Sequence, residues 1–185
     1  MSVIRLYHGS ICLFENIDVS KGKPYKDFGV GFYTADRKKQ AIDLVMRNKA
    51  LEKKRRERLN KPTNISIYLY VYELDVNVLE YDWLKVKRFV NDDRGKIEWL
   101  DFVLANRNSK DKTHDYDIVI GATADDDTRF VIDNYLDGIY GEVISDKAKN
   151  RLYEELEVMN LSTQYYFSTN RAASHLKLIE RVNIK

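Results

Sequence analysis

The fold is decided at residues 26–34, which read Lys26-Asp27-Phe28-Gly29-Val30-Gly31-Phe32-Tyr33-Thr34. This stretch places two glycines, three aromatic residues and one carboxylate in nine consecutive positions. Glycine permits a positive φ angle and a close approach of the backbone to a ligand, so the pair predicts a bend. Phe32 and Tyr33 follow the bend and are typical of the start of a buried strand. The stretch alone fits either a hydrophobic plug at a tight turn or the wall of a pocket.

The composition is that of a globular protein with one domain. The chain has 185 residues, of which 44% are hydrophobic and 32% are charged. This length is sufficient for one substantial core. The 31 basic and 29 acidic residues give a net charge of +2, so the whole surface is not expected to bind polyanions. Any basic binding surface must be local.

The cysteine and histidine content argues against several classes of site. Cys12 is the one cysteine, so an internal disulfide is impossible, and its apolar neighbours predict a buried thiol. With three histidines and no cysteine pair, a structural zinc site is not expected. No signal peptide is recognisable, and no apolar run approaches the roughly 18 residues of a membrane span. We expect a cytoplasmic protein without membrane association.

Strands and helices are mixed along the chain, which predicts a single α+β domain over residues 1–185. Strands are expected at residues 2–7, 65–74, 78–81, 115–121, 163–168 and 177–184. Helices are expected from Arg37 to a stop before Pro62, and at residues 83–90, 96–106, 129–136, 147–159 and 170–176. Thr34 or Asp36 is the expected cap of the first helix. Residues 65–74 have bulky side chains on both faces, which predicts a central strand.

One dense basic run, Lys53-Lys54-Arg55-Arg56-Glu57-Arg58, ends the first predicted helix. A solvated helix end explains it, because cations complement the dipole at a helix C-terminus. A contact for a nucleic acid or an acidic partner also explains it. The sequence leaves both interpretations open.

Several short motifs then occur in a recognisable order along the chain. They are Leu6-Tyr7-His8-Gly9-Ser10, the stretch Asp27 to Thr34, Gln40-Ala41, residues 117–126, the Gln164 to Thr169 segment and residues 172–176. In this order they resemble a bacterial family of uncharacterised domains placed in the ADP-ribosyltransferase superfamily. The resemblance spans nearly the whole chain and is weakest at residues 48–104. It implies a split, two-sheet β core with inserted helices.

The resemblance also implies a reaction and a set of site residues. NAD would be cleaved at the nicotinamide–ribose bond, and ADP-ribose would be transferred to an acceptor. His8 would hydrogen-bond a ribose hydroxyl, Gly9 would bring its backbone against the nicotinamide carboxamide, and Tyr33 would stack on the nicotinamide ring. Thr34, which follows Tyr33 in the same motif, is included among the NAD-binding residues. Gln164 occupies the position where many relatives place a catalytic glutamate.

Gln164 is a departure from the usual pattern, because an amide accepts hydrogen bonds but carries no charge. Another acid would then have to stabilise positive charge on the ribose. Asp27 is the best candidate, because it precedes the glycine bend, and Asp125 and Asp126 come next. Without the glutamate, transfer of single ADP-ribose units is favoured over polymer formation. A noncatalytic module that binds NAD or ADP-ribose is the alternative.

Other interpretations of these residues stay open at this stage. His8, Tyr33 and Gln164 can also be a structural strand-end histidine, a core tyrosine and a surface glutamine. The acids at 125–127 could bind a divalent cation, but helix capping is the more ordinary role and no metal is expected. His114 and His175 have no identifiable partner. The resemblance implies a toxin, sometimes beside an antitoxin, whose acceptor could be protein, nucleic acid or a small molecule.

Overall fold

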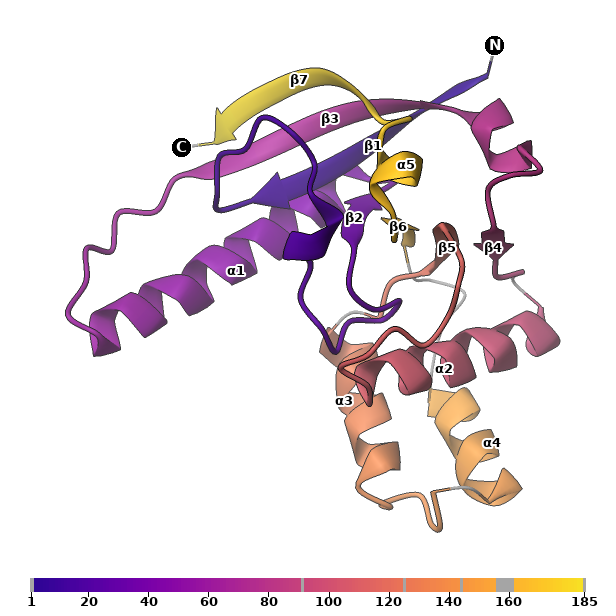
Figure 1. The fold of residues 1–185 in the computed structure, drawn as a ribbon. Coiled ribbons are helices and arrows are strands. Elements are labelled where there is room, and N and C mark those ends of the chain that lie inside the picture. The colour runs from indigo at the N-terminus through magenta and orange to yellow at the C-terminus, as the bar shows by residue number, and fades with distance from the viewer. Residues whose placement is uncertain (1, 91, 125, 144, 156–161, 185) are drawn as a thin grey trace.

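The structure is a computed structural model that describes residues 2–90, 92–124, 126–143, 145–155 and 162–184. Seven strands form one mixed sheet in the order β4-β5-β6-β2-β1-β3-β7 (Figure 1). The strands are β1 Val3–Ser10, β2 Phe32–Ala35, β3 Ile67–Asp75, β4 Val86–Arg88, β5 Ile118–Ala122, β6 Thr163–Phe167 and β7 Lys177–Ile184. The α-helices are α1 Lys38–Arg58, α2 Asp93–Arg107, α3 Asp126–Leu136, α4 Asp146–Glu155 and α5 Asn170–Ala173, and η1 Val19–Lys21 and η2 Val76–Glu80 are 3-10 helices. The predicted α+β class is confirmed.

The sheet has two halves that meet between β1 and β2. In one half, all of β1 pairs antiparallel with β3, and β7 pairs antiparallel with the other side of β3. In the other half, β6 lies between β2 and β5, and β4 pairs parallel with β5. A single residue pair of these fully described strands, Tyr7↔Ala35, joins β1 to β2. The resemblance implied two separate sheets, whereas the seven strands form one sheet whose halves are joined at this fork.

Two large hydrophobic clusters lie on opposite faces of the sheet, and a smaller third cluster lies between α1 and strands β2 and β3. Side chains alternate between the faces of a strand, so Ile118 and Phe167 enter the first cluster while Val119 and Tyr166 enter the second. Helices α2, α3 and α4 gather against the second cluster, below the sheet in Figure 1. Strand β3 is buried on both faces and lies between two strands, as its sequence predicts.

Two predicted elements in the middle of the chain are wrong. Residues 78–81 were expected as a strand, but residues 78–80 belong to η2 and Tyr81 is its C-cap, because Asp75 accepts a hydrogen bond from the Asn77 N–H and starts a turn. Residues 83–90 were expected as a helix but contain β4, because Val86 to Arg88 pair with β5. Pairing with a distant strand overrides local helical preference here.

The N-terminal third differs from its prediction in detail. Strand β1 continues through His8 to Ser10, because these residues pair with β3 instead of breaking the strand. The N-cap of α1 is Arg37, so the expected caps Thr34 and Asp36 do not occupy this position. The Arg37 side chain makes no capping hydrogen bond. Cys12 is exposed, not buried. Among the described residues, no helix is both long and apolar enough to cross a membrane.

Candidate functional site

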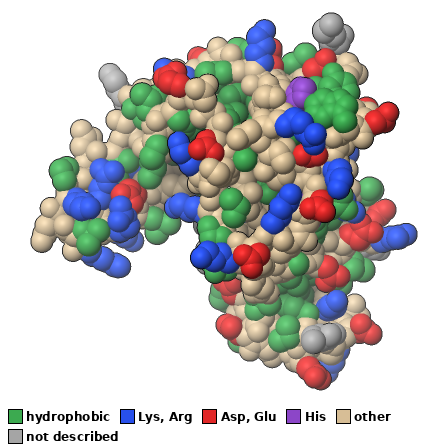
Figure 2. Space-filling view, in the orientation of Figure 1, with side chains coloured by type: hydrophobic (Ala, Val, Ile, Leu, Met, Phe, Trp, Pro, Cys, Tyr) green, Lys and Arg blue, Asp and Glu red, His purple; other side chains and the backbone are tan. Residues whose placement is uncertain are grey.

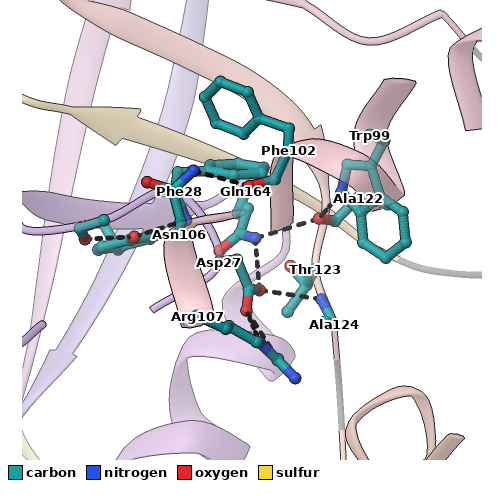
Figure 3. Close-up of polar contacts among 12 residues, drawn as sticks. Asp27, Phe28, Trp99, Phe102, Asn106, Arg107, Ala122, Thr123, Ala124 and Gln164 are labelled. Atoms are coloured by element: carbon teal, nitrogen blue, oxygen red, sulfur yellow. Dashed lines mark hydrogen bonds and ion pairs between the residues drawn. The ribbon is translucent and has the colours of Figure 1, made fainter. Parts of the chain in front are cut away.

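Four segments bring polar groups together at one end of β5 and β6 (Figure 3). Asp27 comes from the loop before β2, Gln164 from β6, and Arg107 from the last residue of α2. Backbone groups of Ala122 and Ala124 come from the end of β5 and the residues after it. We call these five residues the Asp27 cluster.

The carboxylate of Asp27 is the centre of the cluster. Its Oδ1 accepts hydrogen bonds from Arg107 Nε at 2.9 Å and Nη2 at 2.7 Å. Its Oδ2 accepts from Gln164 Nε2 at 2.9 Å and from the Ala124 N–H at 3.1 Å. The residue is only 8% exposed, so the ion pair with Arg107 is needed to compensate for its removal from water. Asp27 is therefore an anchored anion held by four donors.

Gln164 has a fixed amide orientation. It is 7% exposed, and its Nε2 also donates to the backbone carbonyl of Ala122 at 3.1 Å. The carbonyl and the Asp27 carboxylate are both acceptors, so the amide nitrogen must face them. The amide oxygen is left as the atom through which Gln164 can accept a hydrogen bond from a ligand.

Two unpaired polar atoms lie on residues attached to this cluster. Among the described residues, three buried side-chain atoms lack a hydrogen-bond partner, and Arg107 Nη1 and Gln40 Oε1 are two of them. Gln40 Nε2 donates to Thr123 Oγ1, on the residue between Ala122 and Ala124. Buried unpaired polar atoms are rare and call for a ligand, water or a functional role. Arg107 thus has an unused donor and Gln40 an unused acceptor.

His8 lies at the fork between β1 and β2. Its Nδ1 is 2.7 Å from the backbone carbonyl of Tyr33, where the ladder between the two strands has already ended. The ring packs against Phe32 and Phe14, at centroid distances of 4.4 and 5.8 Å. Burial lowers the pKa of His8 to about 4, so the ring is neutral at physiological pH. Because a carbonyl can only accept, Nδ1 carries the proton and Nε2 is an acceptor.

Tyr33 closes the glycine bend with its hydroxyl. The hydroxyl donates to the backbone carbonyl of Gly29 at 2.7 Å and accepts from the Phe28 N–H at 3.0 Å. The ring packs against Tyr166, with 5.0 Å between centroids. Burial raises the pKa of Tyr33 well above its ordinary value, so the hydroxyl keeps its proton. Tyr33 therefore holds the backbone next to Asp27.

The predicted site residues are only partly brought together. Asp27 and Gln164 are in direct contact, and Tyr33 supports the bend that carries Asp27. The His8 ring packs with Phe32 of the first hydrophobic cluster, whereas the Tyr33 ring packs against the second, on the other face of the sheet. His8 reaches Tyr33 through the backbone carbonyl alone.

Gly9 and Thr34 each have a structural role in the fold. A Cβ atom on Gly9 would lie 2.4 Å from the Ala41 carbonyl oxygen and 2.7 Å from Val45 Cβ, so α1 can pack there only against glycine. Thr34 is buried, and its hydroxyl donates to the Tyr165 carbonyl at 3.3 Å. Contact of either residue with NAD stays a prediction.

The sequence did not single out Arg107, which lies one residue beyond the helix predicted at residues 96–106. A buried carboxylate at Asp27 requires a cation, but nothing local distinguishes Arg107 among 31 basic residues. The interpretation of His114 as a residue without a partner is wrong. Its Nε2 is 2.9 Å from the Phe28 carbonyl and its Nδ1 accepts from the Tyr116 N–H, so it also holds the glycine bend.

Acids other than Asp27 do not enter the described site. Asp125 and the side chains of Asp126 and Asp127 lie outside the described residues. Within the part of the chain that the structure describes, no three His, Cys, Asp or Glu residues are grouped so that they could hold a metal ion. The Asp27 cluster is thus built from one ion pair and one amide.

Comparison with known proteins gives one result. A family model described as "Protein of unknown function (DUF3990)" matches residues 4–178. No curated protein and no solved structure matches the chain. The matched range includes the whole Asp27 cluster and, apart from Val3, both strands of the fork.

Proposed function

We propose that this chain, which belongs to the family described as proteins of unknown function (DUF3990), is an NAD-dependent mono-ADP-ribosyltransferase. NAD is a substrate in this reaction, which breaks the nicotinamide–ribose bond and moves ADP-ribose to an acceptor. The bond breaks through a transition state with positive charge on the ribose. The protein must therefore orient NAD and stabilise that charge.

The observation that supports this proposal most is the hydrogen bond between Asp27 and Gln164. A donor bound to an anion becomes more polarised, which strengthens the acceptor at the other end of the same amide. The Gln164 oxygen can thereby accept a hydrogen bond from a ribose hydroxyl and transmit part of the effect of the Asp27 charge to the ribose. The charge of Arg107 offsets this effect in part, so we expect slower turnover than a free glutamate would give.

His8 and the two unpaired atoms provide further support. The neutral His8 ring has Nε2 as an acceptor, the form required for hydrogen bonding to a ribose hydroxyl. Arg107 Nη1 adds a donor on a residue bonded to Asp27, and Gln40 Oε1 adds an acceptor on a residue bonded to Thr123. The resemblance of the His8, Tyr33 and Gln164 motifs links these groups to NAD and extends the proposal to a bacterial toxin controlled by an antitoxin.

The alternative function is a noncatalytic module that binds NAD or ADP-ribose. One observation favours it: the Asp27 carboxylate already has four donors, including the Arg107 guanidinium. A neutralised carboxylate stabilises a developing cation less than a free one does. Binding would then persist while bond cleavage is slow or absent.

The test uses NAD labelled in its adenylate half, with and without bacterial lysate, and follows both nicotinamide release and transfer of label. Wild type is compared with His8→Ala, Tyr33→Ala and Gln164→Ala, and with the exposed β7 variant Lys177→Gln as control. We expect the site variants to lose at least about tenfold in nicotinamide release. Calorimetry measures NAD affinity in parallel. Wild type that binds NAD but neither releases nicotinamide nor transfers label is a binding module, and the enzyme proposal is then wrong.

A further inference from the structure

Helix α1 carries the excess positive charge of the protein. Its sequence holds nine Lys or Arg residues and three Asp or Glu residues, a surplus of six. The whole chain has a net charge of +2, so the residues outside α1 have a net charge of −4. Glu52 pairs with both Arg55 and Arg56, but three carboxylates cannot neutralise nine cations. α1 is thus a cationic helix on an otherwise slightly acidic protein.

The outer half of α1 is not required by the hydrophobic core. The buried residues of the helix, Ala41 and Val45, lie in its first half. Farther along the same side, the partly buried positions are Lys49, Glu52 and Arg56, so the inner face becomes polar. Figure 1 shows the helix running outward past the sheet, and Figure 2 shows Lys and Arg side chains gathered at its outer end. We call residues 49–58 the arm.

The pattern of the arm does not suit a membrane surface. Leu51 is 66% exposed, but Arg55 lies four residues later on the same face, and Arg58 lies seven residues later. A helix that lies in a membrane interface needs its apolar and cationic residues on separate faces. Cations distributed around a projecting helix instead suit a ligand with regularly spaced phosphates, contacted without base readout.

We infer that the arm binds the phosphate backbone of a nucleic acid and that nucleic acid is the acceptor class of this transferase. The second part rests on the proposed function, whereas binding by the arm does not. The first turn of α1 is joined to the Asp27 cluster through the Gln40–Thr123 hydrogen bond. Fifteen residues separate Gln40 from Arg55, or about 22 Å along the helix. At about 3.4 Å per nucleotide, roughly seven nucleotides span from the arm to the site.

Transfer of ADP-ribose to a nucleic acid requires only NAD and the acceptor. A hydroxyl oxygen or a base nitrogen of the nucleic acid forms a bond to C1 of the nicotinamide ribose. The bond from C1 to the pyridinium nitrogen breaks, and its electron pair leaves with nicotinamide, which becomes neutral. The proton of the acceptor atom passes to solvent, so no further reactant is required.

Fluorescence anisotropy with labelled single-stranded RNA and duplex DNA tests the binding surface. The arm variant combines Lys53→Gln, Lys54→Gln and Arg58→Gln, and the control removes the same charge by Lys110→Gln, Lys112→Gln and Lys147→Gln. All six side chains are on exposed residues. We expect wild type to bind a 12-nucleotide strand, and a 4-nucleotide strand much more weakly.

The arm variant should lose at least about tenfold in affinity at roughly 0.1 M salt, and its log–log salt slope should fall by about 2 to 3. The control should bind as wild type does. Equal binding by the arm and control variants overturns the inference. So does competition by polyglutamate, or binding to vesicles containing phosphatidylglycerol, at the same strength as nucleic acid.

Nicotinamide release without nucleic acid separates this inference from the proposed function. If wild type cleaves NAD and labels lysate proteins but neither RNA nor DNA, the acceptor inference is wrong and the proposed function stands. If the arm variant loses nucleic-acid binding while wild type never cleaves NAD, the acceptor role falls with the proposed function and the binding surface stands. Labelling of nucleic acid by wild type and the control, reduced in the arm variant, supports both.

Discussion

The side-chain amide of Gln164 donates to the carboxylate of Asp27 across 2.9 Å, although 137 positions separate the two residues in the chain. The same carboxylate pairs with Arg107, which supplies the compensating charge. An anion, a cation and a neutral amide thus form one buried set, and a change at one member alters what the others require. This mutual dependence can be tested at each position.

Removal of the cation should destabilise the protein strongly. Arg107→Met leaves the Asp27 carboxylate buried without its ion-pair partner, and we expect a loss of about 3–5 kcal/mol in the free energy of unfolding. Urea denaturation followed by circular dichroism measures it. Arg107→Lys keeps the charge but not the two-nitrogen contact, so its loss should be smaller.

The control for this prediction is the double variant Arg107→Met with Asp27→Asn. It removes the buried charge together with its partner, so part of the lost stability should return. A loss below about 1 kcal/mol in Arg107→Met would show that the buried pair does not matter to stability. If the stability losses of the two single substitutions simply add in the double variant, Arg107 and Asp27 are not energetically coupled.

Restoring an acid at position 164 should impair the protein. In Gln164→Glu the new carboxylate faces the Asp27 carboxylate and the Ala122 carbonyl, where two acceptors now lie. This environment raises the pKa of the new acid in the folded state. Its protonated form fits and its ionised form does not, so stability should be retained at low pH and lost as pH rises. We expect a loss of about 2 kcal/mol or more at pH 8 and less at pH 5.

Thermal and urea unfolding at both pH values measure this difference. The matched variant exchanges the two groups, Asp27→Asn with Gln164→Glu, and keeps one anion and one amide. It should be more stable at pH 8 than Gln164→Glu alone. Under the proposed function, Gln164→Glu should not increase nicotinamide release, and a large increase would mean that the amide merely weakens an ordinary glutamate site.

Local patterns predicted those parts of the fold that local forces determine. The strand at residues 65–74 and the helix at residues 96–106 were recognised because burial sets their periodicity. Strand β4 was not, because its conformation depends on pairing with β5, which is distant in sequence. The same limit applies to the site: Asp27 and Gln164 were named from motifs, but their contact, and the need for Arg107, arise from tertiary packing.

Acidification should destabilise the protein through His8. Burial lowers the pKa of His8 from 6.5 to about 4, so the unfolded chain binds this proton first as pH falls. The contribution of the neutral His8 ring to stability is therefore fully present above about pH 6.5 and is lost progressively towards pH 4. A shift of this size corresponds to at most about 3 kcal/mol. Unfolding curves between pH 7 and 4 measure the loss, and His8→Gln should reduce its slope.

His114 contributes in the same direction, because burial also lowers its pKa. The variant His114→Gln is therefore the matched control, and each single variant should remove part of the pH dependence. The titration of the histidine Cε1–H signals, followed by nuclear magnetic resonance, shows how much of the pH dependence comes from each histidine. A His8 signal that titrates near pH 6.5 in the folded protein would contradict the buried, neutral ring.

Removal of the Tyr33 hydroxyl should separate its support of the glycine bend from the proposed stacking of its ring on nicotinamide. Tyr33→Phe keeps the ring but leaves the Gly29 carbonyl and the Phe28 N–H without their partner, so we expect a loss of about 1–3 kcal/mol in stability. The exposed Tyr25→Phe is the control and should be neutral. Under the proposed function, the retained ring should preserve NAD affinity, while a looser Asp27 lowers kcat. If KM rises with kcat unchanged, the hydroxyl acts in NAD binding and not in holding the bend.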